Sequence, residues 1–264
     1  MSADPRDWFG GVGPVLMVHA HPDDETIATG GTLAALAASG LAPAVVTLTR
    51  GEQGDVTAGP FAALAGTPAL AAHREVELAA ALALLGVQRH AFLGTPPARA
   101  EALPPRRYAD SGMRWGPDGW AMPASDAAGD ALTRAAAVEP LSDLIALADA
   151  WAVGAIVSYD ARGGYGHPDH VLAHRLARAV ARGLDVPFWE VVTEPPEGVG
   201  ARTDPPGAPA TESYDCTPWV DRKTAALRAH GTQLTVDGDT IVHVGGQRQP
   251  IATIERFRRL PHPG

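Results

Sequence analysis

Short apolar runs alternate with longer helical stretches through the first 93 residues of the chain. Brief apolar runs predict buried strands, and apolar stretches of helical length predict covering helices. The second helix is the clearer of the two, because Glu75 and Glu77 lie on its polar side and Gly86 provides a stop. The predicted strands are residues 14–20, 44–49 and 90–93, and the predicted helices between them are residues 33–38 and 68–85.

The pattern becomes irregular after residue 93. Residues 94–129 are rich in Pro, Gly and Arg and show little periodicity, and a long irregular loop in a compact domain is usually functional, so we expect part of a substrate lid there. Regular elements then return. They are a helix over 131–150, a strand over 155–159, a helix over 171–182, a strand over 186–193, a connector over 194–209, a helix over 218–230 and a β-rich tail over 233–251 with a turn at Asp237-Gly238.

The β-α-β-α-β order with short connections predicts an α/β fold. We expect a Rossmann-like sheet, mostly parallel, with helices on both faces and a smaller β-rich C-terminal part. With 264 residues the chain is long enough for one large domain. We therefore expect a catalytic domain over residues 1–193 and, over 194–264, a connector, a helix and a β-rich extension that packs on the same domain.

Charge and cysteine content narrow the classes of partner. The formal net charge is −9 and no run of basic residues occurs, which argues against nucleic acid or an anionic membrane and favours a small polar substrate. Cys216 is the only cysteine, so neither an intrachain disulfide nor a thiolate zinc site can form. No export signal or membrane span is apparent, and we expect a cytoplasmic protein with no obligate protein partner.

Two clusters of imidazoles and carboxylates each follow a predicted strand. The first is His21-Pro22-Asp23-Asp24-Glu25, and the second is His167-Pro168-Asp169-His170. In α/β sheets, ligands bind outside the carboxyl ends of the strands, so these distant segments are expected to form one site. Imidazole and carboxylate are ligands that Zn²⁺ accepts, and a spare carboxylate can act as a base for water. The pattern indicates a hydrolytic metal site.

The spacing suggests a division of roles. His21 and Asp24 are three residues apart in a tight loop, and His170 completes a set of two imidazoles and one carboxylate that leaves a fourth position for water. Asp23 is the candidate general base. His167 is a candidate to stabilise an oxyanion or to protonate a leaving amine. Such a site accepts one Zn²⁺ per chain, and Fe²⁺ is the alternative.

Less specific interpretations exist for the same residues. An Asp-Asp-Glu segment after a strand is often a solvated turn or a helix cap. His19 on the strand is expected in the core or behind the ligands, and Asp169 is expected to orient a ligand, since a fourth protein ligand would close the site. A sugar- or nucleotide-binding module without catalysis ranks lower, because no Gly-x-Gly-x-x-Gly follows the first strand. A serine hydrolase is disfavoured because no Gly-x-Ser-x-Gly is present.

These two clusters resemble the hallmark loops of the PIG-L, or LmbE-like, family of zinc-dependent deacetylases, and the resemblance covers most of the chain. It implies a Rossmann-like fold and removal of acetyl from N-acetylglucosaminyl conjugates. It also implies that His21, Asp24 and His170 bind the metal, that Asp23 acts as base, and that His167 assists at the tetrahedral intermediate.

Further segments are similar to the members of this family that act in mycothiol biosynthesis. This similarity implies 1-O-(2-acetamido-2-deoxy-α-D-glucopyranosyl)-1D-myo-inositol as substrate, substrate contacts for Arg74, Asp110 and Glu52, and a polarising hydroxyl from Tyr165. Alternatives are a mycothiol S-conjugate amidase and a deacetylase of another N-acetylglucosaminyl glycoside. Arg74 can instead form a helix-surface pair with Glu75 or Glu77. The similar segments are residues 49–52, 73–78, 107–113, 163–170 and 226–233.

Overall fold

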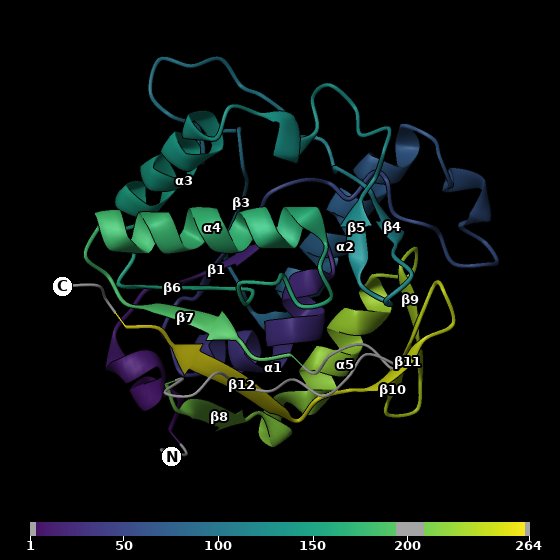
Figure 1. Cartoon of the computed structure of the whole chain (residues 1–264). Coiled ribbons are helices and arrows are strands. Elements are labelled where there is room, and N and C mark those ends of the chain that lie inside the picture. The colour runs from purple at the N-terminus through teal and green to yellow at the C-terminus, as the bar shows by residue number, and fades with distance from the viewer. Residues whose placement is uncertain (1–3, 194–208, 262–264) are drawn as a thin grey trace.

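The computed structural model describes residues 4–193 and 209–261. Its centre is a seven-stranded sheet in the order β3-β2-β1-β6-β7-β12-β8 (Figure 1). The strands of this sheet are β1 Val15–His19, β2 Ala44–Thr47, β3 Arg89–Phe92, β6 Ala155–Ser158, β7 Phe188–Val191, β8 Thr211–Asp215 and β12 Ile254–Arg259.

The sheet is mostly parallel, as predicted. β1 pairs in parallel with both β2 and β6, β2 pairs in parallel with β3, and β6 with β7. Only β12 runs in the opposite direction, and it is antiparallel to both of its neighbours, β7 and β8. The boundary expected after residue 193 falls between β7 and β8, so the residues on both sides of it contribute strands to this one sheet.

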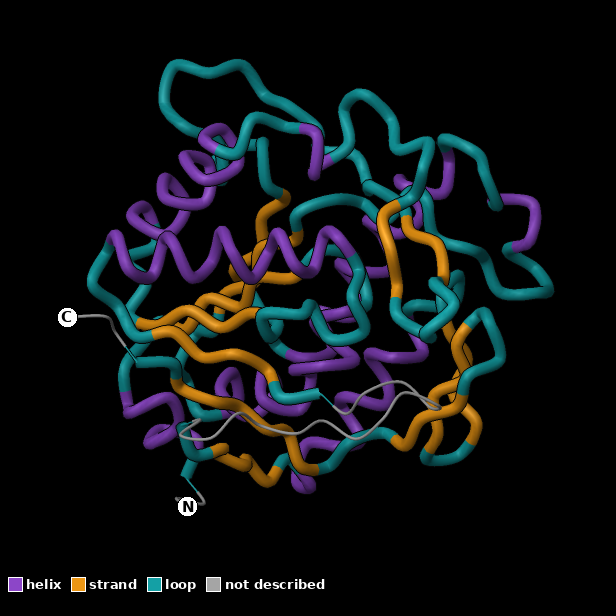
Figure 2. Tube along the Cα trace, in the orientation of Figure 1, coloured by secondary structure: helices purple, strands orange, loops and turns teal. Residues whose placement is uncertain are grey.

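Helices cover both faces of the sheet, which is visible in the tube view (Figure 2). One face carries α3 Val138–Ala150 and α4 Pro168–Gly183, and the other carries α1 Asp24–Ala38, α2 Ala69–Leu85 and α5 Val220–Ala229. Short 3-10 segments are Pro5–Gly11, Ala62–Leu64, Leu132–Arg134 and Thr217–Trp219.

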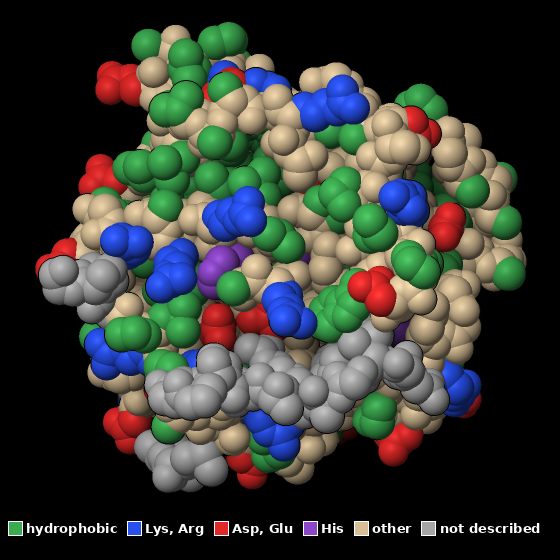
Figure 3. All heavy atoms as spheres, viewed as in Figure 1, with side chains coloured by type: hydrophobic (Ala, Val, Ile, Leu, Met, Phe, Trp, Pro, Cys, Tyr) green, Lys and Arg blue, Asp and Glu red, His purple; other side chains and the backbone are tan. Residues whose placement is uncertain are grey.

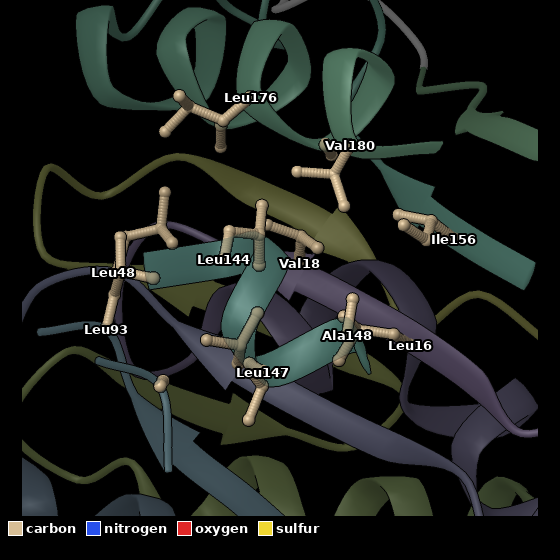
Figure 4. Close-up of a cluster of buried hydrophobic side chains, with 14 of the residues drawn as sticks. Leu16, Val18, Leu48, Leu93, Leu144, Leu147, Ala148, Ile156, Leu176 and Val180 are labelled. Atoms are coloured by element: carbon tan, nitrogen blue, oxygen red, sulfur yellow. The ribbon is translucent and has the colours of Figure 1, made fainter. Parts of the chain in front are cut away.

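The first strand shows why the predicted strands are apolar without alternation. Leu16 and Val18 pack with Leu144 and Val180 under α3 and α4 (Figure 4), whereas Met17 belongs to the core on the opposite face. Successive side chains point to opposite faces, and both faces are buried. The strand therefore has no polar side, and the loop that follows it is the first place where polar groups can gather.

The first helix starts nine residues before its predicted start at residue 33, because α1 begins at Asp24. Gly30 and Gly31 precede the predicted helix in the sequence but lie inside α1. A Cβ on Gly31 would stand 2.5 Å from the Cβ of Cys216. The glycine therefore serves close packing of a neighbouring segment against the helix.

Two other helix starts differ from the prediction by three or more residues, and one stretch expected to be irregular contains strands. α4 starts at Pro168, three residues earlier than predicted, and the helix expected from residue 131 begins only at Val138 after a 3-10 turn. The stretch 94–129, expected to be irregular, contains a hairpin of β4 Met113–Trp115 and β5 Ala121–Pro123.

The C-terminal part confirms the expected β-rich tail and adds two unpredicted strands. A three-stranded antiparallel sheet contains β9 Leu234–Asp237, β10 Thr240–His243 and β11 Arg248–Pro250. β8 and β12 were not predicted, because their sequences are rich in charged residues. The expected connector, residues 194–209, lies outside the described residues except for its last position.

The charge distribution on the surface and the length of the helices can be compared with the partners expected from the sequence. Basic and acidic side chains are interspersed over the face in Figure 3. Within residues 4–193 and 209–261, no helix is both long and apolar enough to cross a membrane.

Candidate metal centre

The two predicted clusters meet between β1 and β6, where the strand order reverses direction. From β1 the chain proceeds through β2 and β3 on one side, and β6 and β7 follow on the other. Such a switch point opens a crevice at the carboxyl ends of the strands. Asp24 begins α1 after β1, and His167 caps α4 after β6. The positive ends of two helices therefore face this crevice and favour negative charge there.

Three side chains bring their donor atoms into an equilateral triangle. The Nδ1 atom of His21 lies 3.2 Å from Oδ2 of Asp24, and Nε2 of His170 lies 3.2 Å from each of these two atoms. In a tetrahedral zinc site with bonds of about 2.0–2.1 Å, neighbouring ligand atoms are about 3.3 Å apart. The nitrogen and oxygen donors predicted from the sequence thus have the separation that zinc requires.

The remaining nitrogen of each imidazole is held by an acceptor. Nε2 of His21 lies 3.3 Å from Asp169 and 3.6 Å from Asp110, and Nδ1 of His170 lies 3.2 Å from the carbonyl oxygen of Gly163. Contacts of this kind fix which nitrogen faces a metal. Asp169 therefore lies where it can orient His21, which is the position expected for it.

The charges of the site favour a cation. Burial alone lowers the pKa of His21, but the carboxylates of Asp110, Asp169 and Asp24 outweigh burial and raise this pKa well above its usual value. Burial alone would raise the pKa of Asp24, but the His170 and His21 rings hold it well below its usual range. Three clustered carboxylates thus attract positive charge, which a divalent metal would supply.

The same pocket offers additional donors. His167 with His21 and His170, and Asp110 and Asp169 with His21, also bring ligand atoms within 4.8 Å of one another. Both of these sets include His21, so they belong to one cluster with several possible ligands. The triangle of His21, Asp24 and His170, with 3.2 Å between each pair of atoms, stays the predicted ligand set.

Tyr159 is a residue of the site that the sequence did not reveal. Its hydroxyl donates to Oδ2 of Asp24 at 2.7 Å and accepts from the backbone N–H of Ala20 at 2.7 Å. Its ring stacks on His170 with a centroid distance of 4.0 Å. Tyr159 therefore positions two of the three ligands. A tyrosine at the end of a predicted strand gave no signal by itself.

Asp23 lies beside the triangle in a strained backbone conformation. Its φ is 114° and its ψ is −34°, a combination that non-glycine residues rarely adopt. Its N–H donates to Oε2 of Glu25 at 3.0 Å, and its Oδ2 lies 3.4 Å from Nη2 of Arg74. Burial raises the pKa of Asp23 to about 6, against the lowering effect of Arg74. A carboxyl group with this pKa can exchange protons near neutral pH.

Glu25 is itself held by a buried contact with His230. Oε1 of Glu25 lies 3.1 Å from Nε2 of His230, and His230 has no exposed surface. Burial alone would raise the pKa of Glu25, but His230 outweighs it and lowers this pKa to about 2. Glu25 therefore stays ionised as the acceptor for the N–H of Asp23. The sequence did not reveal this link, since its two partners are 205 positions apart.

Arg74 holds the Asp23 loop. Its guanidinium donates to the carbonyl oxygens of Pro22 and Gly51, the latter at 2.6 Å, and faces Asp23. These contacts replace the surface pairing with Glu75 or Glu77 that we considered. A Cβ at Gly51 would stand 2.0 Å from Nη1 of Arg74, so only glycine allows this approach. A direct substrate contact by Arg74 stays a prediction.

The other two residues predicted to contact substrate, Asp110 and Glu52, lie in different surroundings. Asp110 is buried at the metal centre, where it accepts from the N–H of Gly112 at 2.8 Å and faces His21. Glu52 contacts its own loop, because its Oε2 accepts from the N–H of Arg50 at 3.2 Å. Asp110 is thus brought to the site, whereas the role of Glu52 stays a prediction.

His167 and Tyr165 are hydrogen-bond donors near the triangle. Nδ1 of His167 accepts from the N–H of Asp169 at 3.2 Å, so the proton of the neutral ring is on Nε2. Burial lowers the pKa of His167 to about 2, with a further contribution from His21. Burial also raises the pKa of Tyr165, and its ring centroid lies 5.1 Å from that of His170. Both groups are neutral donors at ordinary pH.

His19 confirms the expectation of a residue in the core. It has no exposed surface, and its Nε2 lies 3.0 Å from the hydroxyl of Thr29. Burial lowers its pKa. His19 therefore supports the start of α1 from beneath and takes no part in the triangle.

A family model and several relatives match the chain. A relative from Saccharomonospora viridis, 1D-myo-inositol 2-acetamido-2-deoxy-alpha-D-glucopyranoside deacetylase, is 38% identical over 266 residues, which cover 92% of this chain and 93% of the relative. A relative of the same name from Nocardioides sp. is 36% identical and covers 85% of this chain and 84% of its own.

A solved structure described as a deacetylase–teicoplanin complex shares the fold, with a TM-score of 0.62 at 20% identity over 93% of this chain and 96% of that chain. The model of the family described as PIG-L, GlcNAc-PI de-N-acetylase, matches residues 16–181, a range that includes both clusters of the metal centre. The chain belongs to the PIG-L family.

Proposed function

We propose that this protein is a zinc-dependent deacetylase that hydrolyses the acetamide of 1D-myo-inositol 2-acetamido-2-deoxy-α-D-glucopyranoside to the free amine and acetate. The observation that carries the chemistry is the triangle of donor atoms at 3.2 Å with Asp23 beside it. The substrate is supported by the names of relatives that are 36–38% identical over most of the chain. It is the substrate that the similarity to the mycothiol-pathway members implies.

His21, Asp24 and His170 would hold the metal. When bound, zinc acidifies water and polarises the amide carbonyl. The chain itself provides the base. Asp23 accepts the proton of the attacking water while Arg74 and Glu25 hold its carboxylate and backbone in place.

His167 and Tyr165 act on the carbonyl side of the reaction. The Nε2–H of His167 and the hydroxyl of Tyr165 donate hydrogen bonds to the oxygen that gains negative charge as the carbonyl carbon becomes tetrahedral. Asp23, which then carries the proton, supplies it to the leaving nitrogen. The C–N bond breaks and the carboxylate of Asp23 is regenerated. The acetic acid formed gives its remaining proton to the released amine, so the products are acetate and the glucosaminyl ammonium ion.

The experiment compares three substrates with and without a chelator. Amine release is measured from the inositol glycoside, from N-acetylglucosamine and from a mycothiol S-conjugate. We expect fast, chelator-sensitive release from the inositol glycoside. Preference for the S-conjugate would identify an amidase, preference for N-acetylglucosamine would remove the inositol assignment, and insensitivity to chelator would remove the metal from the mechanism.

A further inference from the structure

Trp115 is a large aromatic side chain left half exposed near the metal centre. It is 50% exposed and lies at the end of β4, in the hairpin of β4 and β5. None of the roles assigned above uses it. An exposed indole face beside the candidate metal centre is available for contact with a ligand.

The hairpin is anchored directly to the metal centre. Ser111, two residues before β4, donates its N–H to Oδ2 of Asp169 at 2.9 Å. At its other end, Trp115 pairs with Ala121, whose N–H donates to the carbonyl oxygen of Tyr165 at 2.9 Å. A Cβ on Gly166 would stand only 2.8 Å from the carbonyl oxygen of Ala121, so hairpin and loop are in tight contact. The position of Trp115 relative to the catalytic groups is therefore fixed by the fold.

Three rings lead outward from the metal centre. The centroid of the Tyr165 ring lies 5.1 Å from that of His170, and the centroid of the Trp115 ring lies 5.8 Å from that of Tyr165. If the acetamide lies at the donor triangle, the sugar that carries it occupies the first of these steps, beside Tyr165. The group attached to C1 of the sugar then lies one ring further out, beside Trp115.

We propose that Trp115 is a platform for the second ring of the substrate, the cyclitol of the glycoside. The C–H face of a cyclitol is apolar and can stack on an indole, while its hydroxyl groups point toward solvent. This inference rests on the proposed function and adds the residue that selects a two-ring substrate over a simple sugar.

The test uses two substrates that differ only in the second ring, the inositol glycoside and methyl 2-acetamido-2-deoxy-α-D-glucopyranoside. For W115A we expect kcat/KM on the inositol glycoside to fall about 3- to 10-fold, mainly through KM, because a contact made equally in the ground and transition states changes binding alone. On the methyl glycoside we expect less than about a twofold change. W115F should keep at least half of the wild-type preference, because it retains an aromatic face.

The matched control is L84A. Leu84 is 46% exposed and lies at the end of α2 that leads to the start of β3, whereas the metal centre lies at the carboxyl ends of the strands. This variant should therefore leave the rates on both substrates unchanged. Equal losses on the two substrates, no loss on either, or a W115F variant as impaired as W115A would overturn the platform. Failure of the wild-type protein to release amine from either substrate would instead overturn the proposed function.

Discussion

The charge state of Asp23 sets the pH range in which the proposed base can act. Burial raises its pKa to about 6, and a base must be ionised, so activity is expected to fall as the pH drops through this value. A zinc cation nearby favours the ionised form of Asp23. In the zinc-bound enzyme, the fall of kcat/KM on the acidic side is therefore expected at or below pH 6. The measurement is kcat/KM against pH. A fall of kcat/KM that is centred above pH 7 would contradict the role of Asp23 as the base.

Replacing Asp23 by asparagine should separate chemistry from metal binding. D23N keeps the shape of the side chain but removes the proton acceptor, so kcat is expected to fall about 10²- to 10⁴-fold. Zinc content, measured by atomic absorption, should remain at the wild-type level, because Asp23 is outside the donor triangle. D237N, a change in the exposed pair with Arg248 on the small sheet, is the matched control. If D23N retained near-wild-type turnover, Asp23 would not be the base.

At the scale of residues, the sequence predicts the candidate metal ligands and base but not the side chains that position them. His21, Asp24 and His170 stand in compact motifs whose composition has no structural purpose. Tyr159 and the pair of Glu25 with His230 gain their roles only from contacts between distant positions. The contact of Glu25 with His230 depends on the packing of α5 beside α1, and that of Tyr159 with Asp24 depends on the pairing of β6 with β1. No local pattern encodes either arrangement.

The packing of α1 gives a prediction at the scale of elements. G31A should destabilise the protein by about 1–3 kcal/mol, because the added Cβ would overlap Cys216, and overpacking a buried contact costs this much. G183A is the matched control. Gly183 ends α4 with no atom within 4 Å of an added Cβ, so alanine there should be neutral or stabilise by up to about 1 kcal/mol. Urea unfolding measures both, and equal stabilities would contradict the packing account.

Buried charged residues explain, at the scale of elements, why β12 was not predicted. Its sequence contains Glu255 and Arg258, yet both side chains are buried. Glu255 pairs with Lys223 at 2.7 Å and accepts from the N–H groups of Gly31 and Thr32. Arg258 faces Glu190 at 3.4 Å. Charges that are paired inside the fold look like surface residues in the sequence, so the hydrophobic pattern of a buried strand is hidden.

At the scale of the whole molecule, strand order is what turns two motifs into one site. His21 and His170 are 149 positions apart, and only a parallel sheet with its switch point between β1 and β6 brings them together. The alternation of strands and helices predicted this much, because parallel strands share one carboxyl edge. It did not predict the hairpin of β4 and β5, because this hairpin lies in the stretch 94–129, which has no clear periodicity.

Metal binding should also stabilise the whole fold. Without a cation, the carboxylates of Asp24, Asp110 and Asp169 repel one another around His21, and a ligand that binds only the folded state stabilises it by about 4 kcal/mol at a thousandfold excess over Kd. For a chain of this size that is a rise in Tm of about 10 °C. We expect this rise when zinc is restored to chelator-treated protein and followed by thermal unfolding. H170A, which lacks one donor of the triangle, should lose most of the rise and its stoichiometric zinc, while H243A, a change on β10, should keep both. An equal rise in H170A would show that zinc acts elsewhere than at the triangle.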